Sequence, residues 1–175
     1  MENKPSTFAL CLGYGVIIAL AIIVFSLILF LLNLSSSGLE NLSYLILLGG
    51  IVLSQFNFRN KYQGGFITYG EAVKIGLYSS IFLAVIMGIY TFIFFSYIDP
   101  GAMEEIMTKT EQRMMDQGKT DLEIEQGMKF MEMVNNVGWY TFFAVVGNIV
   151  IGLIISFITA IFVKKEDAGF GQPTA

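Results

Sequence analysis

The sequence has no histidine, a single cysteine and few charged residues, and these shortages exclude several classes of protein. Without histidine, the chain lacks the side chain most often used as a general base and as a metal ligand. Its one cysteine, Cys11, cannot form a disulfide within the chain. The net charge is −4 and no basic cluster is present. Nucleic-acid binding therefore has no electrostatic support.

The charged residues that are present, 14% of the chain, leave four long stretches free of charge. These are residues 8–32, 41–58, 75–98 and 133–163, with 25, 18, 24 and 31 residues. A transmembrane helix needs roughly 20 mainly apolar residues. We therefore expect an all-α integral membrane protein, a single domain over 1–175. Its four transmembrane helices should cover about 8–32, 39–57, 68–98 and 137–163.

The starts of several helices can be predicted from capping-box spacing, in which Ser or Thr precedes Glu by three residues. Ser37 with Glu40, Thr68 with Glu71, and Thr120 with Glu123 all have this spacing. Asp99 precedes Pro100, and this pair is typical of a helix start, with Asp99 as the cap. We expect the polar tail, 164–175, to be flexible.

Residues 99–136 form the one long polar segment, with nine acidic and four basic residues, a net charge of −5. Its periodicity predicts two short amphipathic helices on either side of Gly118. Seven of the nine methionines lie here, and the apolar face of each helix should be rich in them. These faces are predicted to be Met103, Ile106, Met107, Thr110 and Met114 in the first helix, and Ile124, Met128 and Met131 in the second.

Lys and Arg near the span ends predict the orientation. Lys4, Arg59, Lys61, Lys74, Lys164 and Lys165 fall on one side of the membrane if the four spans alternate. This bias places both termini in the cytoplasm and 99–136 on the extracytoplasmic side.

Small residues recur every fourth position in the last two spans. They are Ala72, Gly76, Ser80, Ala84 and Gly88 in the third span, and Ala144, Asn148, Gly152, Ser156 and Ala160 in the fourth. Such rows allow helices to approach closely in lipid, where van der Waals packing replaces the hydrophobic drive. We favour packing between these two helices within the chain. A homodimer face is the alternative.

Three polar residues form a candidate polar site. Asn148 lies at mid-depth in the fourth span, where a polar group is a functional candidate. An interhelical hydrogen bond is the preferred interpretation. Glu71 and Lys74 lie at the start of the third span, and a functional interpretation makes Glu71 a proton carrier or a ligand group. Helix capping and a pair one turn apart explain them more simply.

Metal binding and catalysis have little support in the sequence. Thioethers select Cu(I), but with no histidine or cysteine near the methionines we expect a soft apolar face and no metal site. The sequence has no nucleophile with a base, no phosphate-binding loop and no ligand cluster, so we expect no catalytic residues and no cofactor.

Two stretches resemble a known family. They are Gly64–Gly76, with its Thr-Tyr-Gly-Glu-Ala core, and Tyr97-Ile98-Asp99-Pro100, followed by a charged helical segment and a last span. With the four-span layout, they are similar to the bacterial membrane proteins grouped as domain of unknown function 4199. The resemblance implies a bacterial inner-membrane protein without an established activity. It also implies proximity to membrane glycosyltransferases that use polyprenyl-phosphate lipids, since family members are often encoded beside them.

Two functions follow as hypotheses. The first is a non-enzymatic inner-membrane protein that scaffolds or regulates a membrane protein partner or its own homo-oligomer. The alternative is an accessory or transporter for a lipid-linked sugar or another lipid, working with a membrane glycosyltransferase. A groove open to lipid and lined by Asn148, serines and tyrosines would favour the alternative.

Overall fold

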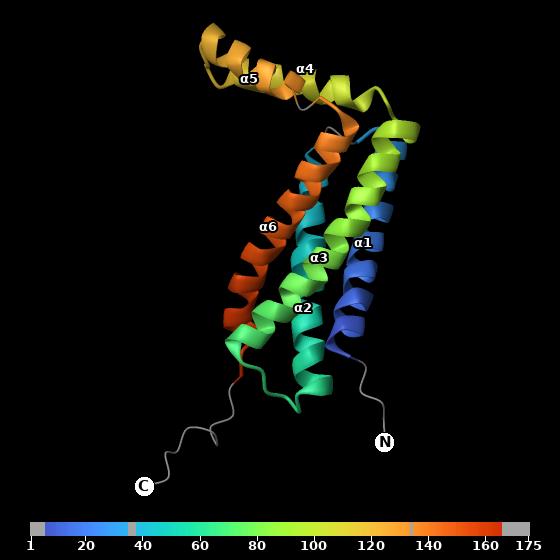
Figure 1. The fold of residues 1–175 in the computed structure, drawn as a ribbon, viewed down its shortest axis with the longest axis vertical. Helices are drawn as coiled ribbons and strands as arrows, with labels where there is room; N and C mark the ends of the chain where they lie inside the picture. Colours follow the sequence, from blue (N-terminus) through green and yellow to red (C-terminus); the bar gives the residue numbers. More distant parts are fainter. Residues whose placement is uncertain (1–5, 35–37, 134, 166–175) are drawn as a thin grey trace. The chain divides into compact units, whose positions relative to one another are not determined.

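Six α-helices account for most of the chain in the computed structural model, which describes residues 6–34, 38–133 and 135–165 (Figure 1). A 3-10 turn, Leu39–Leu42, leads into α2, and a π-helical turn, Phe94–Ile98, extends α3. The α-helices are α1 Thr7–Leu31, α2 Ser43–Tyr62, α3 Tyr69–Ile93, α4 Ala102–Asp116, α5 Asp121–Met133 and α6 Val137–Val163.

Four helical segments are long and apolar enough to cross a membrane: Thr7–Leu31, Leu39–Tyr62, Tyr69–Ile98 and Val137–Val163. Large apolar side chains cover their outer surfaces, as Ile17 at 64% exposed and Phe162 at 77% exposed illustrate. Exposure on this scale would be unfavourable in water and is expected in lipid. The predicted class, all-α with four spans and two short helices between the third and fourth, is confirmed.

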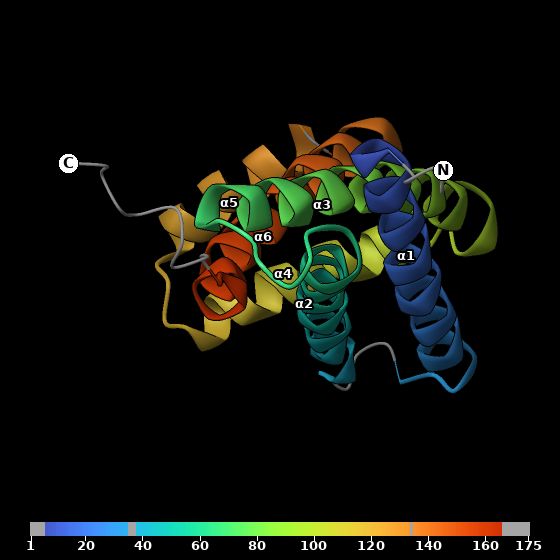
Figure 2. The same cartoon turned by 90° about the horizontal axis from the view of Figure 1, so that it is seen from below.

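The helical core of the first of two compact units contains α1, α2, the part of α3 up to Met87 and the part of α6 from Val146. Among its described residues, two apolar clusters form the interior. One includes Cys11, Ile75 and Ala160, and the other includes Ile18, Ile51 and Leu83. Figure 2 shows these helices from the end at which α2 turns into α3.

The second unit covers Gly88–Val145, with the end of α3, the helices α4 and α5, and the first turns of α6. The helices α4 and α5 form a hairpin that turns at Gly118, whose φ of 70° lies in the left-handed region that glycine favours. A Cβ on Gly127 would lie 2.7 Å from Met114 Cε, so the hairpin is closely packed there. The predicted apolar faces are the half-buried faces of both helices.

Two of the three predicted capping boxes form. Thr68 N and Oγ1 donate to the Glu71 carboxylate at 3.0 and 2.9 Å, and the Glu71 amide donates back to Thr68 Oγ1 at 3.3 Å. Thr120 and Glu123 repeat this arrangement at the start of α5. Ser37 lies outside the described residues.

Asp99 does not cap α4, contrary to the prediction. The helix begins at Ala102 after Gly101, and the Asp99 carbonyl accepts the Ala102 N–H at 3.2 Å. The Asp99 N–H itself donates to Phe94 O at 2.9 Å and closes the π-helical turn. Proline disfavours helical backbone in the residue before it, so Pro100 ends one helix without starting the next at Asp99.

Two boundaries also differ from the expected ones. The helix α2 continues to Tyr62, five residues past the expected end at 57. The first residues of the predicted flexible tail are ordered, because Ile67 and Lys165 form an antiparallel β-bridge with backbone hydrogen bonds of 2.9 and 3.0 Å. The rest of the predicted tail, 166–175, lies outside the described residues.

Candidate functional site

The rows of small residues on α3 and α6 face each other through two reciprocal pairs. A Cβ on Gly76 would lie 2.3 Å from Ser156 Oγ, and a Cβ on Gly152 would lie 2.3 Å from Ser80 Oγ. Each serine hydroxyl donates to a carbonyl of its own helix, Ser80 to Gly76 O at 2.8 Å and Ser156 to Gly152 O at 2.6 Å. The glycines thus provide the space in which these hydroxyls lie.

The remaining small residues of the two rows differ in how deeply they are buried. Ala72, Ala84 and Ala160 are fully buried. In the second unit, a Cβ on Gly88 would lie 2.5 Å from Val145 Cγ2, while Ala144 is half-buried.

A fully buried glutamine, Gln55, lies beside this contact in the first unit. Its Nε2 donates to Ala72 O at 3.1 Å and to Ser156 O at 3.4 Å, so one side chain of α2 ties α3 to α6. Within the described part of the chain, Gln55 Oε1 and Ser79 Oγ are buried without a hydrogen-bond partner. Amide hydrogen bonds between helices contribute about 0.6–2 kcal/mol in membranes.

Sequence reasoning missed Gln55 and selected Asn148 as the amide at mid-depth. Asn148 is half-buried, whereas Gln55 is completely buried. The cause is the early end predicted for α2, which put Gln55 in a last turn before a polar loop. Because α2 continues, Gln55 lies two turns inside the helix. A four-residue spacing to Ile51 and Arg59 could have indicated the longer helix.

The basic end of α2 stabilises the end of α6. Arg59 Nη1 donates to Val163 O at 3.0 Å, at the last residue of that helix. A cation at a helix C-terminus is favourable because the last carbonyls carry partial negative charge. The Arg59 guanidinium also lies 4.4 Å from the Phe56 ring centroid.

Glu71 and Lys74 have ordinary structural surroundings. Glu71 accepts both capping hydrogen bonds from Thr68, and Lys74 is exposed to the surroundings. Among the described residues, all ion pairs lie in α4, in α5 or in the turn between them. The two residues are therefore not brought together as a site.

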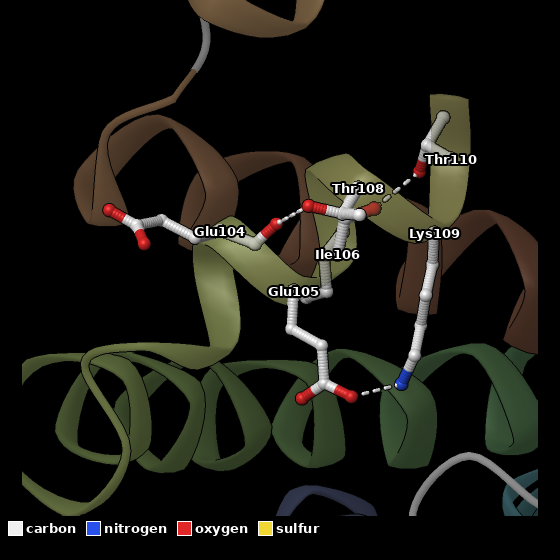
Figure 3. Close-up of polar contacts among 6 residues, drawn as sticks. All are labelled: Glu104, Glu105, Ile106, Thr108, Lys109 and Thr110. Atoms are coloured by element: carbon white, nitrogen blue, oxygen red, sulfur yellow. Dashed lines mark hydrogen bonds and ion pairs between the residues drawn. The ribbon is translucent and has the colours of Figure 1, made fainter. Parts of the chain in front are cut away.

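Several side-chain contacts within α4 join residues four positions apart (Figure 3). Thr108 and Thr110 hydroxyls donate to Glu104 O and Ile106 O at 3.0 and 2.7 Å, and Lys109 pairs with Glu105. An exposed ion pair between residues four positions apart in a helix contributes only about 0.3–0.5 kcal/mol to stability. These contacts stay within one helix and form no site.

The capping box of α5 lowers the pKa of the Glu123 carboxyl. The Thr120 backbone N–H contributes most, then the Thr120 hydroxyl, and then the charge of Lys119. A lowered pKa in the folded state means that the capping interaction is present at neutral pH. It is lost as the pH falls through that lowered pKa.

The described residues of the second unit form a groove and a cavity. A groove of about 430 Å³ runs between α4 and α5, with an apolar floor and an acidic rim. Its lining consists of Glu111, Met115, Asp121, Ile124, Glu125, Met128, Lys129 and Glu132. A cavity of about 220 Å³ lies between the hairpin and the start of α6, and its walls are almost wholly apolar. They are formed by Met103, Ile106, Met107, Phe130, Met131, Asn135, Tyr140 and Phe143.

No group of three or more His, Cys, Asp or Glu side chains with metal-binding geometry occurs in the described ranges. The chemistry that these two hollows offer is recognition of apolar and cationic groups.

Four membrane-length helices with apolar outer faces, joined to a polar helical hairpin, define a multi-span α-helical membrane protein. Over residues 13–165 the chain matches the family described as Protein of unknown function (DUF4199), and it belongs to this family. The match confirms the resemblance carried by Gly64–Gly76 and Tyr97–Pro100. No curated protein and no solved structure matched.

Proposed function

We propose that this chain is a non-enzymatic interaction protein of a bacterial inner membrane, and that it holds a partner protein through the α4–α5 groove. The composition of the groove is the observation that carries the proposal. The half-buried Ile124 and Met128 provide an apolar floor, the more exposed Met115 lies beside them, and acidic side chains complete the lining. Protein interfaces commonly have an apolar centre and a polar rim. Methionines suit such a surface because their side chains adapt to irregular partners.

The charge of the rim indicates the kind of partner. Four carboxylates and one ammonium group line the groove, so its net charge is −3. A basic amphipathic segment of another membrane protein complements both the rim and the floor. A second copy of this chain would bring another acidic hairpin, and like charges would oppose its docking. We therefore assign the groove to a different protein.

The lipid-linked sugar alternative has less support from the described residues. It required a groove lined by Asn148, serines and tyrosines. Ser80 and Ser156 instead fill the contact between α3 and α6, and their hydroxyls bond within their own helices. Neither of the two hollows described above is lined by Asn148 or by a serine.

Photo-crosslinking in cells tests the interaction. A photoreactive residue at Ile124 should crosslink to a membrane protein at a segment rich in Lys or Arg, as mapped by mass spectrometry. Asp121→Lys with Glu125→Lys should reduce this product about tenfold or more, because the rim then repels the segment. Glu104→Lys with Asp116→Lys makes the same change in net charge outside the groove and should leave the product intact. Equal loss in both double variants, or a product with a second copy of this chain, would contradict the proposal.

The orientation follows from the basic residues, which we place in the cytoplasm. Their grouping supports this, since Arg59 donates to the last carbonyl of α6, beside Lys164 and Lys165. In a Cys11→Ser background, cysteine at Gln117 should react with an impermeant thiol reagent in intact cells with a permeable outer membrane. Cysteine at Gln63 should react only after the inner membrane is opened. The reverse pattern would refute the orientation.

A further inference from the structure

The apolar cavity of the second unit has room for part of a hydrocarbon chain. Its volume of about 220 Å³ exceeds that of the apolar cavities of roughly 150 Å³ that take up benzene. Among its lining residues, only Asn135 and Tyr140 carry polar side-chain groups. Water needs two to four polar partners in a buried site, so a cavity of this kind favours an apolar occupant.

The position of the cavity gives it access to lipid. Tyr140 and Phe143 lie in the first two turns of α6, which is one of the spanning helices. Trp139 beside them is 55% exposed, as expected for aromatic residues at a membrane interface. Phe143 and Phe130 line the cavity and are also about half exposed, so the cavity reaches the surface. The cavity therefore adjoins exposed aromatic side chains at the start of a spanning helix.

The walls of the cavity suit a flexible chain. Met103 and Met107 lie one turn apart on α4, and Met131 faces the same space from α5. Unbranched thioether side chains adjust to irregular apolar shapes. A bilayer supplies hydrocarbon chains at very high local concentration, so even a modest preference for the cavity fills it.

The negative charge of the α4–α5 hairpin favours some lipid headgroups over others. Residues 99–136 carry a net charge of −5, and this disfavours anionic headgroups nearby. An ammonium headgroup complements the acidic faces of α4 and α5. We propose that the cavity holds one acyl chain of a zwitterionic phospholipid with an ammonium headgroup. This site is separate from the partner groove and does not depend on it.

Native mass spectrometry of the full chain in detergent tests this inference. The protein is offered equal amounts of phosphatidylethanolamine and phosphatidylglycerol. We expect one phosphatidylethanolamine retained per chain. Met107→Trp fills the cavity and should reduce retention about tenfold, the effect of losing the burial of about two methylene groups. Met115→Trp, in the partner groove, should retain the lipid as well as the unchanged protein does.

Met131→Trp fills the cavity from the opposite wall and decides the matter if Met107→Trp does not fold. Folding is checked by circular dichroism and thermal unfolding. Equal retention by the unchanged protein and by the folded cavity variants would overturn the inference. Preferential retention of phosphatidylglycerol would overturn it as well, because the acidic faces would then not be selecting the headgroup.

Discussion

Replacing Gly15 by alanine is expected to destabilise the protein by about 1–3 kcal/mol, the usual cost of overpacking a tight contact. A Cβ at Gly15 would lie 2.6 Å from Phe82 Cβ, 2.8 Å from Ser79 O and 3.0 Å from Leu83 N. Two of these atoms belong to the backbone of α3, and none is the end of a flexible side chain. A rotamer change therefore cannot relieve the clash, and α1 and α3 must separate.

Gly13 provides a matched control in the same helix. A Cβ there would have no neighbour within 4 Å. Alanine favours helix over glycine by up to about 1 kcal/mol, so Gly13→Ala should be neutral or slightly stabilising. Thermal unfolding in mild detergent should show a melting temperature several degrees lower for Gly15→Ala than for Gly13→Ala. If both variants melt together, the close approach of α1 and α3 at Gly15 is incorrect.

The spans could be predicted from sequence because lipid imposes a simple requirement. Apolar helices in lipid need length and freedom from charge, and both are properties of a continuous stretch. The range expected for the fourth span, 137–163, coincides with α6. The boxes at Thr68 and Thr120 were also predictable, because their hydrogen bonds join residues only three positions apart.

Features that depend on distant residues were not predictable in this way. The importance of Gly15 rests on Ser79 and Leu83, more than sixty positions away. Gln55 was assigned to the end of a helix because the polar residues after it suggested a loop. Those residues continue α2, in part because Arg59 finds a partner in the Val163 carbonyl. Sequence periodicity does not report such a contact.

In the candidate sites, too, the features within one helix could be predicted and those between helices could not. The Met faces of α4 and α5 followed from helical periodicity within each segment. Their enclosure of a cavity required knowing that Met103 and Met107 lie opposite Met131, and that Tyr140 and Phe143 complete the wall. The acidic rim of the groove similarly combines Glu111 of α4 with Asp121 and Glu125 of α5. Periodicity predicts which residues share a face of one helix. The groove and the cavity depend on how the helices pack against one another, which periodicity does not predict.

The contact between α3 and α6 leads to the second large effect, which is expected for Gly152→Leu. A Cβ at Gly152 would lie 2.3 Å from Ser80 Oγ and 2.4 Å from Ser80 Cβ, and the Ser80 backbone is 3.7 Å away. The leucine side chain has further carbons to place in this filled space. Ser80 cannot move far, because its hydroxyl is held by Gly76 O. We expect destabilisation of about 1–3 kcal/mol from overpacking.

Gly147→Leu is the control on the same helix, since a Cβ at Gly147 would have no neighbour within 4 Å. It adds the same apolar bulk to α6 and should leave stability nearly unchanged. Gly76→Leu should repeat the effect of Gly152→Leu from the other helix, because its Cβ would lie 2.3 Å from Ser156 Oγ and 2.9 Å from Gln55 Nε2. Melting temperatures of the three variants in detergent provide the measurement. Equal stability of Gly152→Leu and Gly147→Leu would mean that the small residues of α3 and α6 do not set the distance between these helices.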